Sequence, residues 1–276
     1  MKKDLIFRAS DGEKLAVTTY GRCSGPDCRC IIYVHGFKGF KDWGFVPCLG
    51  EFLAHKDFFV VTFNFSHNGI GNVPDEFTEL DKFARNTLSR EVRELSELVD
   101  ACRAGFLGQA ENPRIGLLGH SRGGGTAIST AAGKPDIRAI ALWASVASFD
   151  RYSDDAKAEW RKNGYTESVN QRTGQIMRLN VTLLDDIERH KNDLLNIERA
   201  VRHMSRPLLI VHGDRDESVP VTEGRQIFAW ADPSQTQLLI VPGTGHTFDA
   251  RHPFDGSNDK LEAVLQATAE FFDRYL

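Results

Sequence analysis

The chain has 276 residues, of which 41% are hydrophobic, so it is long enough to bury one large core. Its formal net charge of −4 leaves no basic surface for nucleic acid, which excludes that class of partner. Its longest apolar runs have the length of strands, so we expect no membrane-spanning segment and no membrane partner.

Short apolar runs alternate with segments of helical periodicity, which predicts an α/β protein with a mostly parallel sheet and helices on both faces. We expect a single domain over residues 1–276, opening with a β-hairpin. Helical spacing predicts a long amphipathic helix from Leu80 to Cys102 and a closing helix from Leu261 to Phe272. The expected strands are, in chain order, Leu5–Arg8, Lys14–Tyr20, Ile31–Val34, Phe59–Phe65, Ile115–Leu118, Ile137–Trp143, Leu208–Val211 and Leu238–Val241.

The segment Gly119-His120-Ser121-Arg122-Gly123 follows one apolar strand directly and precedes a helix that begins with small residues. This G-x-S-x-G pattern predicts a nucleophile elbow, a sharp turn between strand and helix with a serine at its tip. Glycines flank the serine because the crowded turn leaves no room for side chains there. The free N–H groups at the start of the helix should point back toward Ser121 and favour negative charge.

Two further reactive side chains follow strand ends downstream, in the order serine, acid, histidine. One strand is followed by a polar loop with Asp214, Asp216 and Glu217, and a later strand by a glycine-rich turn that presents His246. Because the carboxyl ends of parallel strands lie at one edge of the sheet, we expect these groups to meet there. His246 would then take a proton from Ser121, and an aspartate would orient the imidazole.

These motifs and the segment Tyr33-Val34-His35-Gly36-Phe37 resemble the α/β-hydrolase superfamily, and the resemblance runs from about Leu5 to Leu276. It is closest to compact serine esterases and related peptidases with a short cap, such as bacterial carboxylesterases of the cinnamoyl and feruloyl esterase type. The resemblance implies an α/β-hydrolase fold. It implies no cofactor and no metal, since a hydrolytic triad needs only water.

The resemblance also assigns roles to individual residues. It implies that Ser121 is the nucleophile and His246 the general base, with Asp216, the second aspartate after His-Gly, as the acid. Asp214 is the alternative acid, and otherwise shapes the loop by accepting backbone N–H groups. The oxyanion hole would consist of the backbone N–H groups of Phe37 and Arg122.

Residues 149–204 interrupt the alternation of strands and helices. This segment is strongly charged and has no clear buried strand, so we expect an inserted helical cap over the strand ends. Its aromatic residues either line the substrate pocket or anchor the cap on the sheet. Two more aromatic residues follow the oxyanion turn, and form a pocket wall or cover the end of the sheet. The candidate substrate-binding residues are therefore Phe40, Trp43, Phe149, Tyr152, Trp160 and Tyr165.

The five cysteines are an odd count, which excludes a full disulfide framework. Cys23, Cys28 and Cys30 lie close together, and could bind a metal or form one disulfide. No Cys or His pair follows at zinc-site spacing, so we expect surface-turn and strand thiols. Reduced thiols and the lack of a signal peptide predict a cytoplasmic location.

We therefore expect a serine hydrolase that cleaves small-molecule carboxylic esters through an acyl-enzyme. An aminopeptidase or amidase with the same triad is the alternative. Such an enzyme would recognise the substrate amine with cap carboxylates, of which the segment offers Glu159, Glu167, Asp185, Asp186 and Glu188. A non-catalytic hydrolase-fold protein that binds a small molecule or a partner is the third hypothesis. Periodicity does not indicate the oligomeric state.

Overall fold

The computed structural model describes residues 1–25 and 27–276. Its centre is an eight-stranded sheet in the order β1-β2-β4-β3-β5-β6-β9-β10. The strands are β1 (Lys2–Arg8), β2 (Lys14–Tyr20), β3 (Arg29–Val34), β4 (Phe59–Phe63), β5 (Arg114–His120), β6 (Ile137–Trp143), β9 (Leu208–Gly213) and β10 (Thr236–Val241). Strand β2 is antiparallel to β1 and β4, and the other neighbouring pairs are parallel. The expected opening hairpin and the mostly parallel sheet are confirmed.

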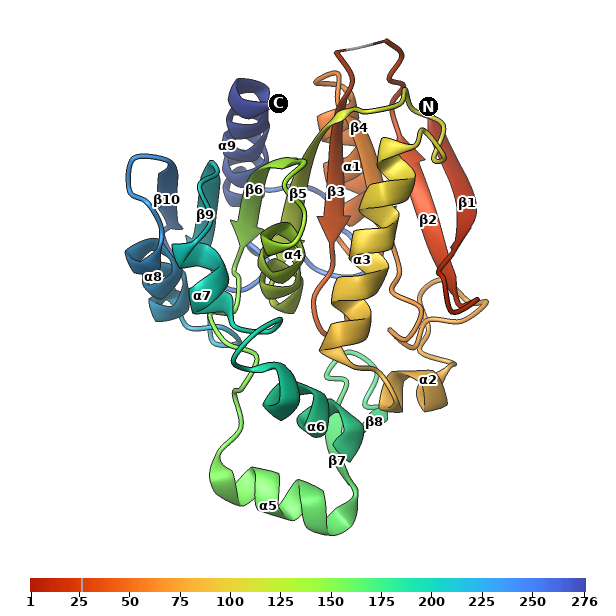
Figure 1. Ribbon diagram of the computed structural model, residues 1–276, viewed down its shortest axis with the longest axis vertical. Helices are drawn as coiled ribbons and strands as arrows, with labels where there is room; N and C mark the ends of the chain where they lie inside the picture. The colour runs from red at the N-terminus through yellow and green to blue at the C-terminus, as the bar shows by residue number, and fades with distance from the viewer. Residues whose placement is uncertain (26) are drawn as a thin grey trace.

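Helices cover both faces of this sheet. They are α1 (Val46–Ala54), α3 (Leu88–Arg103), α4 (Arg122–Ala132), α8 (Val221–Trp230) and α9 (Asp259–Tyr275), whereas the short helix α2 (Leu80–Ala84) lies beyond the ends of the strands (Figure 1). In Figure 1, α3 and α4 lie in front of the sheet, with α1 and α9 behind it. Two buried clusters match these layers, because one contains Leu95 and Ile128 from the front helices, and the other contains Leu49 and Phe272 from the rear ones. The strands are buried on both faces for this reason, which explains their continuous apolar runs.

The long helix expected from Leu80 to Cys102 is wrong as a single element. The chain leaves the helix after Ala84 and starts α3 at Leu88. Thr87 is extended and its hydroxyl accepts the Arg90 N–H, so it caps a new helix instead of continuing the old one. Because the hydrophobic spacing runs through the break, periodicity alone could not locate it.

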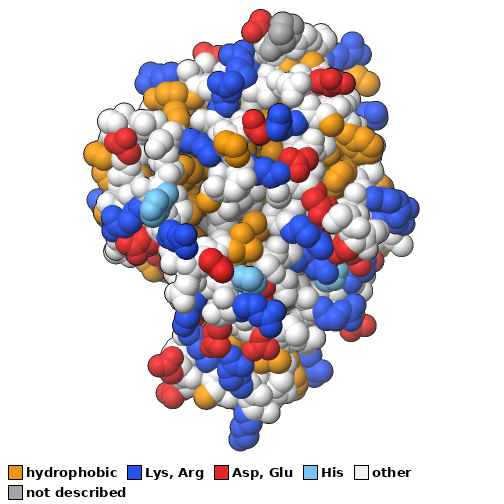
Figure 2. Space-filling view, in the orientation of Figure 1, with side chains coloured by type: hydrophobic (Ala, Val, Ile, Leu, Met, Phe, Trp, Pro, Cys, Tyr) orange, Lys and Arg blue, Asp and Glu red, His pale blue; other side chains and the backbone are white. Residues whose placement is uncertain are grey.

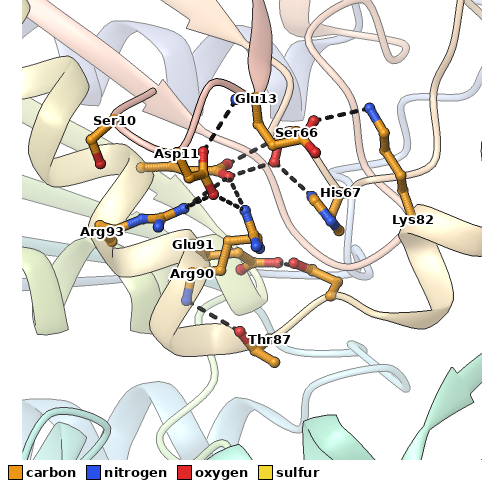
Figure 3. Close-up of polar contacts among 12 residues, drawn as sticks. Ser10, Asp11, Glu13, Ser66, His67, Lys82, Thr87, Arg90, Glu91 and Arg93 are labelled. Atoms are coloured by element: carbon orange, nitrogen blue, oxygen red, sulfur yellow. Dashed lines mark hydrogen bonds and ion pairs between the residues drawn. The ribbon is translucent and has the colours of Figure 1, made fainter. Parts of the chain in front are cut away.

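A polar network ties α3 to the first hairpin and to the loop after β4 (Figure 3). Asp11, in the turn between β1 and β2, accepts hydrogen bonds from Arg90 and Arg93 at 2.6 Å each. The buried carboxylate of Glu94 accepts the backbone N–H of Ser66 at 3.0 Å. Burial raises the pKa of Glu94. The network holds α3 against the sheet. This helix also carries Glu91, which points toward the elbow. On the face with α3 and α4, basic and acidic side chains are interspersed (Figure 2).

The segment between β6 and β9 lies beyond the carboxyl ends of the strands (Figure 1). It contains α5 (Asp154–Asn163), β7 (Tyr165–Val169), β8 (Ile176–Asn180), α6 (Val181–His190) and α7 (Ile197–Arg202). The expected helices are therefore joined by an antiparallel hairpin, β7–β8, that the sequence analysis did not predict. Of the residues in these two strands, only Met177 and Leu179 are buried, so the apolar alternation is too short to show as a pattern.

The prediction that all thiols are reduced is wrong for two of them. Cys23 and Cys28 form a disulfide, with their Cα atoms 5.3 Å apart, a spacing that suits such a bond. Cys30, Cys48 and Cys102 are free, and burial raises the pKa of Cys30.

Within residues 1–25 and 27–276, no cluster of three His, Cys, Asp or Glu could hold a metal ion. Across the same residues, the helices are too short or too polar to cross a membrane.

Candidate active site

Ser121 lies at the tip of the turn between β5 and α4, with φ 57° and ψ −125°. A positive φ is strained for a residue with a side chain, and such strain persists only where the surroundings hold the backbone. Here the Ser121 N–H donates to the Trp143 carbonyl at 2.9 Å, and the Ser121 carbonyl accepts the Gly124 N–H at 3.0 Å. The backbone of the predicted elbow is thus held from both sides.

Two glycines allow this turn to close. A Cβ on Gly119 would lie 2.5 Å from the Gly123 carbonyl oxygen, which is too close for any side chain. A Cβ on Gly36 would lie 2.8 Å from the Ser121 Cβ. The backbone of the loop after β3 therefore runs directly beside the serine, as an oxyanion loop must.

His246 and Asp216 form a hydrogen-bonded pair. The His246 Nδ1 lies 2.8 Å from the Asp216 Oδ2, and the other carboxylate oxygen accepts the N–H groups of Ser218 and Val219 at 2.9 Å each. Burial raises the pKa of Asp216, but hydrogen bonds from His212 and His246 outweigh it and bring this pKa below its usual range. The carboxylate thus stays charged and accepts a hydrogen bond from the Nδ1–H group, which leaves the unprotonated Nε2 of His246 available as a base.

The other aspartate of the loop contacts different groups. Asp214 accepts the Gly243 N–H at 2.7 Å, which joins the loop after β9 to the turn after β10. His212 donates from Nε2 to the Val219 carbonyl at 2.8 Å and closes the same loop from inside. Asp216 and not Asp214 is the carboxylate that reaches His246.

The oxyanion loop is fixed by a neutral histidine. His35 donates from Nδ1 to the Gly36 carbonyl at 2.9 Å and accepts the Phe65 N–H on Nε2 at 3.3 Å. Burial lowers the pKa of His35 to about 4, so the ring can keep one acceptor nitrogen at neutral pH. In the described part of the chain, the Phe37 N–H has no hydrogen-bond acceptor, and Arg122 is the first residue of α4, where N–H groups lack helical partners.

Arg122 and Phe37, the two predicted oxyanion residues, contact each other, and Arg122 also forms an ion pair with a buried glutamate. The Arg122 guanidinium lies over the Phe37 ring, 4.8 Å from its centroid, and donates to Glu91 of α3 at 2.6 Å. The Glu91 side chain is 1% exposed and also accepts bonds from Asn86 and Thr126. Glu91 therefore holds the Arg122 side chain where it stacks on the Phe37 ring.

We expect Glu91→Gln to lower kcat for ester hydrolysis about tenfold, because the oxyanion donors lose their alignment. It should also lower the free energy of unfolding by about 2–3 kcal/mol, since a glutamine leaves the Arg122 cation without its counter-charge. Steady-state kinetics and urea unfolding measure the two effects. Asp11→Asn removes another carboxylate that α3 contacts, and should lower stability alone. A Glu91→Gln enzyme with reduced stability but unchanged kcat would contradict the positioning role.

Two pockets meet at Ser121 and His246. The first, which we name the α6 pocket, has a volume of about 440 Å³ and lies under α6. The second, the hairpin pocket, has a volume of about 340 Å³ and lies beside β7–β8. Phe37, Ser121, Ser218 and His246 line both. The walls of the α6 pocket are mostly apolar, formed by Leu88, Val146, Phe149, Tyr152, Leu183, Ile187 and Val219.

The structure brings four of the six candidate substrate-binding residues to these pockets. Phe149 and Tyr152 line the α6 pocket, and Phe40 and Trp43 line the hairpin pocket. The other two lie elsewhere, and their prediction as pocket-lining residues is wrong. Trp160 is buried between α5 and β8, where its Nε1 donates to the Leu179 carbonyl at 2.9 Å.

Tyr165, the second of these, stacks under the Arg178 guanidinium on the hairpin. Several other residues that line the hairpin pocket could not be predicted from the sequence. They are Phe77, Asn170, Gln171 and Arg172, which come from two separate segments. Their positions depend on the packing of β7–β8, for which the sequence carries no signal.

The profile of the prolyl oligopeptidase family matches residues 50–276, which is most of the chain and includes the elbow, the acid loop and the histidine turn. The chain belongs to the prolyl oligopeptidase family. The predicted membership of the α/β-hydrolase superfamily is confirmed.

Solved structures show the same fold. The esterase domain from a Rhodothermus marinus protein has 20% sequence identity and a TM-score of 0.66, over 100% of this chain and 99% of that domain. Est1E from Butyrivibrio proteoclasticus, with ferulic acid bound, has 21% identity and a TM-score of 0.72 over 98% of each chain. A curated relative is the pimeloyl-[acyl-carrier protein] methyl ester esterase of Xylella fastidiosa (strain 9a5c). It is 28% identical over 57% of this chain and 71% of the relative.

Proposed function

We propose that this chain is a serine carboxylesterase that works through an acyl-enzyme. Ser121 is the nucleophile, His246 the general base, Asp216 the residue that orients it, and the backbone N–H groups of Phe37 and Arg122 form the oxyanion hole. The observation that carries the proposal is the position of Ser121 and His246 at the junction of two pockets, with Asp216 on the far nitrogen of the imidazole.

The reaction follows from these positions. The His246 Nε2 takes the proton from the Ser121 hydroxyl while the serine oxygen forms a bond to the ester carbonyl carbon. The negative charge on the carbonyl oxygen is stabilised by the Phe37 and Arg122 N–H groups. Collapse of this intermediate breaks the bond to the alcohol, which receives the proton from His246. Water then repeats the sequence and releases the acid.

The charges of the pockets support an esterase over an aminopeptidase. Among the described residues that line the two pockets, none is Asp or Glu, so nothing there would bind a substrate amine. Four of the five acidic candidates of the inserted segment have other partners. Arg161 pairs with Asp185 and Glu188, Arg178 pairs with Glu167, and Asp186 accepts the Ser89 N–H at 3.0 Å. The names of the Rhodothermus domain and the Xylella relative, both esterases, support the same choice, whereas the family is named after a peptidase.

We expect p-nitrophenyl esters from acetate to decanoate to be hydrolysed, with faster turnover for acyl chains that fill the α6 pocket. Aminoacyl p-nitroanilides should not be hydrolysed, because the pockets offer no carboxylate for the amine. Initial rates on the two panels measure this difference. Anilide turnover at rates comparable with the esters would favour the aminopeptidase. No turnover of either panel by folded protein would favour the binding protein.

The same proposal covers the inserted segment and the location of the protein. Residues 149–204 act as the cap of a single-domain enzyme, since Phe149, Tyr152, Leu183 and Ile187 line the α6 pocket.

A cytoplasmic location stays a prediction. The disulfide of Cys23 and Cys28 argues against it, and cell fractionation decides between the two.

A further inference from the structure

The charged side chains of the hairpin pocket all have the same sign. Lys38, next to the oxyanion residue Phe37, and Arg172, in the turn between β7 and β8, both line it. The two histidines of the lining are the base His246 and His120, and burial lowers the pKa of His120 to about 3. At neutral pH, the pocket next to the nucleophile therefore has two cationic side chains, and none of its described lining residues is a carboxylate.

In the described part of the chain, Lys38 and Arg172 pair with backbone carbonyls and not with carboxylates. The Lys38 Nζ donates to the Val169 carbonyl at 2.6 Å, and Arg172 donates to the Asp75 carbonyl at 2.8 Å. Within residues 1–25 and 27–276, neither has a carboxylate within 4.0 Å. Burial lowers the pKa of Lys38, as expected for a cation without a counter-charge.

The arginines of the α6 pocket provide the contrast. Arg122 pairs with the buried Glu91 at 2.6 Å, and Arg151 pairs with Glu223 of α8. Their charges are satisfied within the protein, and the remaining walls of that pocket are mostly apolar. The two pockets that meet at Ser121 therefore differ in electrostatic character, and each suits a different half of an ester.

The other walls of the hairpin pocket indicate which groups could lie beside an anion bound by the two cations. Phe40, Trp43 and Phe77 line it with aromatic rings, which favour a flat or apolar group. Asn170 is 6% exposed, and its Nδ2 has no acceptor in the described chain, while its Oδ1 accepts the Arg172 N–H at 3.1 Å. The buried Asn170 side chain thus holds the turn that carries Arg172.

We propose that the hairpin pocket binds the half of the ester that carries a carboxylate, with Lys38 and Arg172 as its counter-charges. This inference rests on the proposed esterase function and specifies its substrate class: monoesters with an apolar group on one side of the scissile bond and an anionic group on the other. Arg172 can bind a carboxylate through two N–H groups, whereas Lys38 offers a compact charge.

The test compares charged and neutral esters in two matched pairs. 4-Acetoxybenzoate and 4-acetoxybenzamide place the charge on the alcohol half, and phenyl hydrogen succinate and phenyl butyrate place it on the acyl half. For each pair, kcat/KM of the anionic ester is divided by that of the neutral ester. We expect Arg172→Gln to lower this ratio about fivefold in at least one pair, as befits a partly exposed ion pair. The single variant Lys38→Met should also lower this ratio in the same pair, by more than Arg172→Gln does. Added salt should reduce the ratio of the wild-type enzyme.

Arg178→Gln is the matched control, because Arg178 lies on the same hairpin, pairs with Glu167 and does not line the pocket. It should leave both ratios unchanged. If Arg172→Gln changes charged and neutral esters equally, or leaves both ratios as they are, the anionic subsite is wrong. Failure of the esterase proposal looks different, because neutral esters would then show no turnover that depends on Ser121.

Discussion

Ser121→Ala is expected to lower kcat for ester hydrolysis by about 10⁶, the loss found when a triad serine is removed from comparable hydrolases. The reason is that no other hydroxyl occupies the tip of the elbow, and a methyl group cannot form the acyl-enzyme. The fold should not change, because the contacts that hold this turn are made by the Ser121 backbone, whose N–H donates to the Trp143 carbonyl. Initial rates on p-nitrophenyl esters, with circular dichroism for folding, measure the result.

Ser96→Ala is a suitable control, since it makes the same chemical change on α3, outside both active-site pockets. It should hydrolyse esters at the wild-type rate. Full activity in Ser121→Ala would remove this serine from the mechanism and leave the elbow without a catalytic role. A residual rate above that of water is still expected, because the oxyanion N–H groups of Phe37 and Arg122 stay in place.

Most of the central sheet could be predicted because its physical cause acts within short segments. A parallel strand buried on both faces must be apolar along its length, so Ile115–Leu118 and Leu208–Val211 are visible as runs. The elbow is visible for a similar reason: the backbone approaches itself so closely at Gly119 that only glycine fits. The edge where strand ends meet then follows from the parallel order of the strands, before any side-chain contact is known.

The features that the sequence did not predict depend on packing between distant segments. The strands β7 and β8 bury only two hydrophobic side chains, Met177 and Leu179, which are too few for a clear period of two. The pairing of Glu91 with Arg122 joins residues 31 positions apart on different helices, and each alone is typical of a solvated helix face. Lys38 and Val169, which meet at the hairpin pocket, are 131 positions apart. Motifs thus predict the candidate reacting groups, while the shape and charge of the pockets required the structure.

Asp216→Asn is expected to lower kcat by about 10⁴, the effect of this exchange in a serine-protease triad. The hydrogen bonds around Asp216 determine how the asparagine must lie. Ser218 and Val219 donate two N–H groups to one carboxylate oxygen at 2.9 Å, so the amide oxygen of an asparagine would take that side. Its NH₂ group would then face His246 Nδ1 as a donor. The imidazole would have to accept there, and its proton would move to Nε2, the nitrogen that must act as the base.

Asp214→Asn separates this effect from a general change in the loop. Asp214 lies two residues away, and in the described part of the chain its side chain accepts only the Gly243 N–H, at 2.7 Å, so an asparagine can keep that bond through its amide oxygen. We expect its kcat to stay within about twofold of wild type, with KM unchanged, as for a surface substitution that keeps its hydrogen bond. Rates for the two variants on one ester, measured side by side, decide between the two aspartates. A larger loss in Asp214→Asn than in Asp216→Asn would make Asp214 the acid of the triad, against the 2.8 Å contact between Asp216 and His246.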